Sequence, residues 1–503
     1  MQMDIATKHT DLIVSERKAL TLIHLLCKAL EAEHVVYCHW KSNAALDRSA
    51  CGDNDLDLLV ERACAARFVE ILSQLGFKEA IVPPGQQSPG IMNYYGLDEE
   101  SGKLVHVHAH YQLILGQDMT KNFRLPIERP YLQSAVQGDL FKIPSPEYEF
   151  IVFLLRMVIK HSTWEVVLSQ LHKLSATERD ELAYLKSRVD YRKVYSILEK
   201  HLPFVDAELF NACEESIQPG CHLWARLKTG QRLKRNLGAH ARRPRTIDSF
   251  IILFRRVAIP IKRRLLRTLP RGRLSQGGAI VAVVGGDGAG KSTAIDELYD
   301  WLFPHFETIR IHMGKPAWSW MTISVRGLLK VGRMLGLYPF MRAPVQYIDD
   351  QEALIFPGYP WLIREVCTAR DRYKTYIKAR RFASKGGIVL SDRYPLPQIK
   401  YMDGPQGERM TIRHSKNWFI NHITKIEKAY YGSILPPEIL IVLKVDPEIA
   451  VQRKTDETSS MVRARSREIW ELDWHKTSAK IIDASDSKEA VLSTLKSLIW
   501  SEL

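Results

Sequence analysis

The sequence lacks several features that would place it in well-known protein classes. Its seven cysteines include no C-x-x-C pair, which argues against both a disulfide framework and a zinc knuckle. No apolar run reaches the roughly 20 residues that a membrane-spanning helix needs. There is no internal repeat, and the first 18 residues mix charges where a signal peptide would be basic and then apolar. We therefore expect a cytoplasmic protein with reduced thiols.

Length and composition indicate a globular chain with more than one domain. The 503 residues exceed what a single core usually holds, and 46% hydrophobic with 25% charged residues is typical of folded proteins. The net charge of +14 is concentrated in one segment, because residues 226–273 contain 16 Lys or Arg and one acid, Asp248. A segment of this kind indicates an anionic partner or a solvated linker.

Hydrophobic periodicity predicts an α/β protein in four zones. The first zone has expected helices at 20–32 and 62–75 and strands at 34–39, 55–60 and 104–111. The second should be helical, with Ser175 and Glu178 spaced as a capping box at a helix start. The expected domains are a small α/β domain at 1–140, a helical domain at 141–225, a basic helical linker at 226–275 and a second α/β domain at 276–503.

A phosphate-binding loop stands at the start of the last zone. The stretch GGDGAGKS fits G-x-x-x-x-G-K-[ST], follows an apolar strand at 279–284 and precedes an amphipathic helix at 293–302. In this context Lys291 reaches the β- and γ-phosphates of ATP, and the Ser292 hydroxyl binds Mg²⁺. The residues expected to hold the nucleotide are Gly285, Gly286, Asp287, Gly288, Ala289, Gly290, Lys291, Ser292 and Thr293.

Two further groups of charged residues suit phosphoryl transfer. Asp392 and Arg393 follow an apolar strand at 388–390, where Asp392 could complete a Mg²⁺ shell and Arg393 could bind the phosphate of an acceptor. The alternative is a surface ion pair. Arginines at alternate positions could form a lid over the phosphates, or else an exposed arginine-rich face; they are Arg463, Arg465 and Arg467.

Together, the stretches GGDGAGKST, SDRY, LKVDPEIAVQRK and IIDASDSKEAV resemble the thymidylate kinase family over residues 279–503. The resemblance implies a parallel five-stranded sheet wrapped by helices, ATP on the loop and an acid–arginine pair on the acceptor phosphate. It also implies that Asp287 faces the acceptor sugar, that Asp392 and Arg393 serve the metal and the acceptor, and that the lid arginines stabilise the transition state.

The sequence departs from the family around the acceptor. HMGKPAW stands where an acidic-Pro-Gly turn is expected, and PLPQIKYMDGPQGER replaces the thymine-recognition residues. We therefore predict an ATP-dependent phosphotransferase for a small acceptor, with Asp403 and Arg409 as candidate acceptor contacts. The alternatives are a nucleotide-dependent switch and a nucleotidyltransferase acting in surface polysaccharide biosynthesis or on nucleic acid.

A second candidate site lies near the N-terminus. Asp55 and Asp57 are two apart on a predicted strand and so share one face, as carboxylates that clamp a divalent metal must. With Lys41-Ser42-Asn43 as a phosphate-binding turn, the pattern resembles the nucleotidyltransferase superfamily. No third acid follows; instead the next strand carries His106, His108 and His110, which could bind a metal or be hydrogen-bonded structural residues.

The segment 249–273 combines an apolar stripe with many cations. Three interpretations stay open: an interdomain helix packed by its apolar side, a helix on an anionic membrane surface, and a nucleic-acid contact, the last being the least favoured. The second would make the protein peripheral to the inner membrane face. The oligomeric state is not fixed by the sequence, with which a dimer is compatible.

Overall fold

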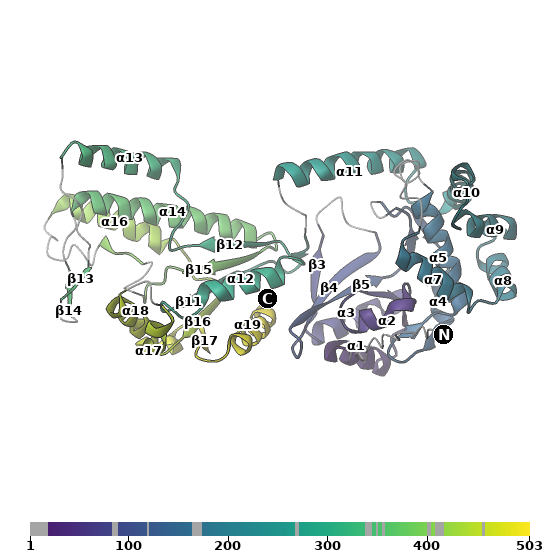
Figure 1. Cartoon of the computed structure of the whole chain (residues 1–503), viewed down its shortest axis with the longest axis horizontal. Helices are drawn as coiled ribbons and strands as arrows, with labels where there is room; N and C mark the ends of the chain where they lie inside the picture. The colour runs from purple at the N-terminus through teal and green to yellow at the C-terminus, as the bar shows by residue number, and fades with distance from the viewer. Residues whose placement is uncertain are drawn as a thin grey trace, which may run out of the picture. The chain divides into compact units, whose positions relative to one another are not determined.

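The computed structural model describes residues 19–82, 89–117, 120–162, 174–266, 271–337, 345–348, 351–354, 358–399, 404–407, 417–454 and 458–503. The chain forms two compact units, Met1–Leu269 and Pro270–Leu503, which are described separately (Figure 1). Asp403 and Arg409 lie outside the described residues.

The first unit begins with a mixed sheet in the order β1-β2-β5-β4-β3. Its central pair, β2 and β5, is parallel, and the other neighbours are antiparallel. The strands are β1 (Tyr37–His39), β2 (Leu56–Val60), β3 (Lys78–Ile81), β4 (Ile91–Asp98) and β5 (Lys103–His110). Apolar faces of α1 (Thr21–Ala32) and α3 (Ala65–Gln74) pack with this sheet in one core, so the predicted helices and strands of this zone are confirmed in type.

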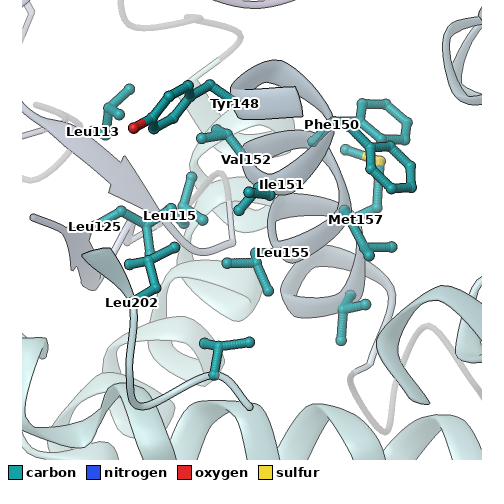
Figure 2. Close-up of a cluster of buried hydrophobic side chains, with 14 of the residues drawn as sticks. Leu113, Leu115, Leu125, Tyr148, Phe150, Ile151, Val152, Leu155, Met157 and Leu202 are labelled. Atoms are coloured by element: carbon teal, nitrogen blue, oxygen red, sulfur yellow. The ribbon is translucent and has the colours of Figure 1, made fainter. Parts of the chain in front are cut away.

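The rest of the first unit is mainly helical and surrounds one buried helix. Along α5 (Pro146–His161) thirteen side chains are buried, and the close-up shows residues of α5 beside Leu113, Leu115 and Leu125 of a small hairpin (Figure 2). The Ser175–Glu178 capping box is present. The other elements are α2 (Leu46–Ala50), β6 (Leu113–Leu115), β7 (Phe123–Leu125), α4 (Glu128–Gln133), β8 (Val136–Gln137), β9 (Lys142–Ile143), α7 (Ala176–Lys186), α8 (Tyr191–His201), α9 (Ala207–Ser216), α10 (Leu223–Asn236) and α11 (Arg245–Leu266).

The second unit contains a five-stranded parallel sheet in the order β12-β15-β11-β16-β17. The three central strands are runs of β-branched and aliphatic residues because a parallel sheet covered by helices is buried on both faces. The strands are β11 (Ile280–Gly285), β12 (Thr308–His312), β15 (Ile388–Asp392), β16 (Ile439–Lys444) and β17 (Lys480–Asp483). The predicted parallel five-stranded sheet wrapped by helices is confirmed.

Helices cover this sheet, and two short strand elements lie outside it. The helices are α12 (Lys291–Leu302), α13 (Trp320–Met334), α14 (Tyr359–Ala383), α16 (Trp418–Gly432), α17 (Pro447–Arg453), α18 (Ser459–Glu471) and α19 (Lys488–Glu502). The short elements are β10 (Arg273–Leu274) and the hairpin of β13 (Val345–Ile348) and β14 (Gln351–Leu354). Among the described residues, no helix has both the length and the apolar character needed to cross a bilayer.

Helix α11 carries the basic segment, and several of its large apolar side chains are exposed. Those that are at least half exposed are Ile247, Phe250, Leu253, Phe254, Val257 and Ile261. The three interpretations of this segment stay predictions.

Candidate functional sites

The phosphate loop joins β11 to α12 with a backbone conformation that favours glycine at two points. Gly288 and Gly290 have φ of +81° and +80°, in the left-handed region. Gly286 is required for a different reason, since a Cβ there would lie 2.6 Å from Ser466 Oγ on α18. Lys291, buried at the start of α12, donates from Nζ to the Gly286 carbonyl oxygen at 2.6 Å. The Lys291 ammonium thus binds a backbone carbonyl of the phosphate loop itself.

A hydroxyl and a carboxylate meet beside the loop. Ser292 Oγ donates to Asp392 Oδ2 at 3.3 Å, because β15 lies next to β11 in parallel register and ends at the same edge of the sheet. The other oxygen, Asp392 Oδ1, is buried and has no hydrogen-bond partner among the described residues. Oxygen donors of this kind are those that Mg²⁺ prefers, so both residues predicted for the metal fit a Mg²⁺ ion.

Two arginines from distant segments converge on the loop at Asp287. Arg393 Nη2 lies 2.9 Å from Asp287 Oδ1, and Arg465 Nη1 lies 2.8 Å from Oδ2. The Asp287 side chain is only 1% exposed. Burial alone would raise its pKa, but Arg465, Lys291 and Arg393 outweigh burial and the pKa is lowered. Asp287 is therefore an ionised anchor for two cations, and its predicted contact with an acceptor sugar stays a prediction.

Arg393 adopts an unusual backbone conformation at this point. Its φ is +60°, in the left-handed region that costs a non-glycine residue free energy. The turn after β15 aims the guanidinium back at the loop rather than outward. The alternative of a surface ion pair between Asp392 and Arg393 is not what the structure has, since Arg393 pairs with Asp287 instead.

The three predicted lid arginines differ in their contacts. They lie on a regular helix, α18, where residues two apart point about 200° away from each other. Arg465 contacts Asp287 in the loop, whereas Arg463 Nε and Nη2 lie 2.7 and 3.0 Å from the Glu448 carboxylate and Arg467 Nε lies 2.6 Å from Glu471 Oε1. A lid role for all three stays a prediction, which the contact of Arg465 with the loop supports for that residue. Ser466, the next residue, donates to the Asp287 carbonyl oxygen at 3.1 Å.

The sequence did not reveal the buried polar groups that hold two other loops of the second unit. Arg372 on α14 donates to the carbonyl oxygens of Met313 and Gly314 at 2.8 and 3.1 Å. Glu427 on α16 accepts from the amides of Gln406 and Gly407 at 3.0 and 2.9 Å, and burial raises its pKa to about 7. No local motif marks such residues, because each binds the backbone of a distant segment.

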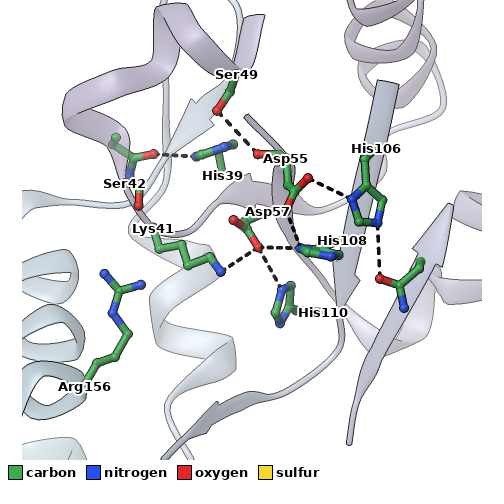
Figure 3. A network of polar contacts seen from close by, with 12 residues as sticks. His39, Lys41, Ser42, Ser49, Asp55, Asp57, His106, His108, His110 and Arg156 are labelled. Carbon is green, nitrogen blue, oxygen red and sulfur yellow. Dashed lines mark hydrogen bonds and ion pairs between the residues drawn. The ribbon is translucent and has the colours of Figure 1, made fainter. Parts of the chain in front are cut away.

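In the first unit, parallel pairing of β2 with β5 brings the two aspartates against the three histidines (Figure 3). Asp57 Oδ1 lies 3.3 Å from both His108 Nδ1 and His110 Nε2, and 2.8 Å from Lys41 Nζ. Asp55 Oδ1 lies 2.8 Å from His106 Nδ1, whose other nitrogen faces Asn93 Oδ1 at 3.2 Å. The shared face expected for Asp55 and Asp57 is present.

Electrostatics keep Asp57 ionised beside a neutral His110 ring. Burial lowers the pKa of His110 to about 4, so the ring is neutral near pH 7. Burial alone would raise the pKa of Asp57, but hydrogen bonds from His108 and His110 bring it well below the usual range. The contacts of His110 with Asp57 are therefore hydrogen bonds rather than ion pairs.

The aspartates open onto a cavity of about 450 Å³. Its wall is of mixed charge, with five cations and four carboxylates. The charged lining residues are Lys41, Arg48, Asp55, Asp57, Lys121, Arg156, Lys160, Glu178 and Glu181.

The turn expected to bind phosphate is occupied by the protein itself. The amide of Ser42 donates to Glu181 Oε1 at 3.1 Å, and the amide of Asn43 donates to Glu149 Oε1 at 3.4 Å. Carboxylates from α5 and α7 thus accept the two amides of this turn, and binding of a phosphate by Lys41-Ser42-Asn43 stays a prediction.

The loop, the strand-end carboxylate and the parallel sheet give the second unit a P-loop NTPase-like α/β fold. No protein-family model matches the chain. It is 28% identical over 184 residues to an Escherichia coli (strain K12) protein described as uncharacterized ATP-binding protein YghR, covering 35% of this chain and 69% of that protein. It is 25% identical over 225 residues to uncharacterized ATP-binding protein YghS of the same strain, covering 41% and 90%.

A solved structure is also similar to part of the chain. The thymidylate kinase from Candida albicans matches 44% of this chain and 91% of its own, with 19% identity and a TM-score of 0.29.

Proposed function

We propose that the second unit is an ATP-dependent phosphotransferase. The phosphate loop supports ATP as the donor, as do two relatives described as ATP-binding. The observation that carries the proposal is the convergence of Arg393 and Arg465 on Asp287 beside the loop. A nucleotide switch needs a donor site only, whereas transfer also needs cations where charge develops between donor and acceptor.

Each side chain then has a defined part in the reaction. Lys291 would exchange the Gly286 carbonyl oxygen for the β- and γ-phosphates, and Ser292 with Asp392 would hold Mg²⁺. When bound, Mg²⁺ neutralises charge on the phosphates. Arg393 would bind the acceptor, a nucleotide or another small phosphorylated or hydroxyl compound, and Arg465 would stabilise the transferring group.

A single-turnover assay with γ-labelled ATP and Mg²⁺ tests this proposal, using nucleoside monophosphates, sugars and sugar phosphates as acceptors. We expect label on one class of acceptor. Arg465→Ala should slow transfer at least a hundredfold, because a transition-state cation is lost. Arg467→Ala is the matched control and should change the rate less than twofold, since Arg467 binds Glu471 away from the loop. Slow hydrolysis with no labelled acceptor would favour the switch.

A nucleotidyltransferase-like activity of the first unit is a second candidate. The observation that favours it is that Asp55 and Asp57 lie two residues apart at strand β2 and both line one cavity. Replacing both with Asn should abolish metal-dependent nucleotide transfer to any acceptor. Metal-dependent activity of the whole chain that is unchanged in this double variant would rule the candidate out.

A further inference from the structure

The cluster on β2 and β5 contains a set of three donor atoms that differs from a magnesium site. The atoms are Asp57 Oδ1, His108 Nδ1 and His110 Nε2, all within 4.8 Å of one another. The carboxylate oxygen lies 3.3 Å from each imidazole nitrogen. Donor atoms around a tetrahedral ion with bonds of about 2.05 Å are roughly 3.3 Å apart, so the spacing matches such an ion.

The chemical nature of these three donor atoms indicates which metal ion would bind. Magnesium prefers six oxygen ligands, whereas neutral imidazole favours zinc and other first-row transition metals. Two imidazoles and one carboxylate form the open three-ligand arrangement that these metals use in proteins.

The neighbouring side chains of the cluster are held in place beside the donors. His106 is fixed through both nitrogens, by Asp55 Oδ1 at 2.8 Å and Asn93 Oδ1 at 3.2 Å, and stacks on Tyr95 with ring centres 4.1 Å apart. The His106 and His108 rings meet edge to face with centres 4.2 Å apart, so His106 packs directly against one donor ring.

Lys41 competes for the same oxygen. Its ammonium lies 2.8 Å from Asp57 Oδ1 and would have to move for an ion to bind there. Because Lys41 and Asp57 both line the cavity, an ion bound by Asp57 would lie at the wall of that cavity.

We propose that Asp57, His108 and His110 form a centre for an imidazole-preferring divalent transition metal, at the wall of the cavity that Asp57 lines. This site is separate from the phosphate loop and does not depend on the phosphotransferase function or on nucleotide transfer by the first unit.

Titration of the full chain with Co²⁺ in the absence of nucleotide tests the centre. We expect one equivalent to bind with a visible d–d absorption band that Zn²⁺ removes at stoichiometric amounts and that excess Mg²⁺ leaves intact. His108→Ala should weaken Co²⁺ binding at least tenfold. His24→Ala, which removes an exposed imidazole of α1 in the same unit, should not.

Two further variants separate a metal role from a structural one. Lys41→Met removes the competing ammonium and should tighten Co²⁺ binding several-fold, an effect that a purely structural cluster would not produce. His106→Ala should weaken binding less than His108→Ala. Absence of a stoichiometric band, a band that survives in His108→Ala, or equal competition by Mg²⁺ would each overturn the proposal. Far-UV circular dichroism checks that each variant is folded.

A different observation supports a second, independent inference about α11. Its exposed apolar residues recur at helical spacing, with Phe250 and Phe254 68% and 62% exposed. The sequence from 245 to 273 has nine Lys or Arg and one acid, Asp248. The phosphate groups of a nucleic acid would attract the cations but leave the apolar residues in water. An anionic lipid surface would attract the cations and also bury the apolar residues.

We infer that α11 lies on an anionic membrane surface, with Phe250 and Phe254 in the headgroup region and the net positive charge of the segment attracting it to anionic lipid. Each cation near such a surface contributes about 1 kcal/mol. Vesicles of phosphatidylcholine with phosphatidylserine should carry the chain upward in a density gradient, and pure phosphatidylcholine vesicles should do so much less.

The matched variants differ in where they add charge. Phe250→Glu with Phe254→Glu should lower the floated fraction at least fivefold. Val136→Glu with Leu435→Glu, which alters exposed apolar residues outside α11, should leave it unchanged. The inference is overturned if anionic vesicles do not float the chain, if the first pair floats normally, or if salt-sensitive RNA binding or self-association through α11 occurs without flotation.

Discussion

Asp287 is the shared partner of three cations in the second unit. Three cations act on one buried carboxylate: Arg393 and Arg465 bind it directly, and Lys291 is close enough to lower its pKa. A buried charge is stable only when it is paired, so each partner holds the others in place. A residue in the middle of a glycine-rich loop thereby becomes the centre of an ion-pair network.

Replacing Asp287 with Asn should therefore destabilise the second unit. Two arginines would lose their counterion, and the free energy of unfolding should fall by about 3 kcal/mol. Asp296→Asn is the control, because Asp296 pairs with Arg310 at an exposed position and should change stability by less than about 1 kcal/mol. Urea denaturation of both variants at pH 7 measures the difference. Equal losses would contradict a buried anchor.

Glu149 predicts a pH dependence in the first unit. Burial raises its pKa from 4.5 to about 7, so between these values the folded chain holds a proton that the unfolded chain has released. Stability therefore falls as the pH rises from about 4.5 to about 7, by about 3 kcal/mol in total. Glu149→Gln keeps an acceptor for the Asn43 amide and should lack this loss. Urea denaturation at pH 5 and pH 8 compares the two proteins, and parallel pH profiles would refute the assignment.

Among the helices, α18 packs on the phosphate loop and holds it in place. It packs so tightly on the loop that Gly286 has no space for a side chain, and it supplies Arg465 and Ser466 to Asp287. Because α18 is one continuous helix, a displacement of its backbone moves the contacts of Arg465 and Ser466 together.

Gly286→Ala should separate α18 from the loop. A Cβ would lie 2.7 Å from Ser466 Cα, which forces a backbone shift, and we expect a loss of about 2 kcal/mol in stability with at least tenfold weaker ATP binding. At Gly432, on the last turn of α16, an added Cβ meets no atom within 4 Å. Gly432→Ala should leave both quantities nearly unchanged. Calorimetric titration with ATP and thermal denaturation test the pair, and tight ATP binding by Gly286→Ala would show that α18 is not essential to the site.

At the scale of the whole molecule, the chain has two units with separate hydrophobic cores. The nucleotide residues all belong to the second unit, and the aspartate–histidine cluster belongs to the first. A ligand that binds one folded unit should stabilise that unit alone. The reason is that binding shifts only the unfolding equilibrium of the unit to which the ligand binds.

Calorimetry should therefore resolve two unfolding transitions. ATP with Mg²⁺ at a hundred times its dissociation constant should stabilise one of them by about 2.7 kcal/mol and leave the other in place. Lys291→Ala should abolish the shift without moving the second transition. A single transition that ATP shifts as a whole would show instead that the units unfold together.

The sequence by itself determined the elements and the donor site. The phosphate loop, the strand before it and the helix after it were predicted from a continuous stretch, because glycine conformations and apolar periodicity act over a few residues. The β2 and β5 strands that carry the aspartates and histidines were predictable for the same reason. The predicted acceptor contacts at Asp403 and Arg409 lie outside the described residues.

Only the tertiary structure decided which charges meet. Asp287 and Arg465 are 178 residues apart, and nothing local distinguishes Arg465 from Arg463 or Arg467 until α18 packs with one face on the loop. Likewise, carboxylates of α5 and α7 accept hydrogen bonds from the amides of Ser42 and Asn43, which belong to the turn predicted to bind phosphate. Local patterns fix what a segment can form, but pairing between distant segments depends on how their surfaces fit, which the order of residues along the chain does not display.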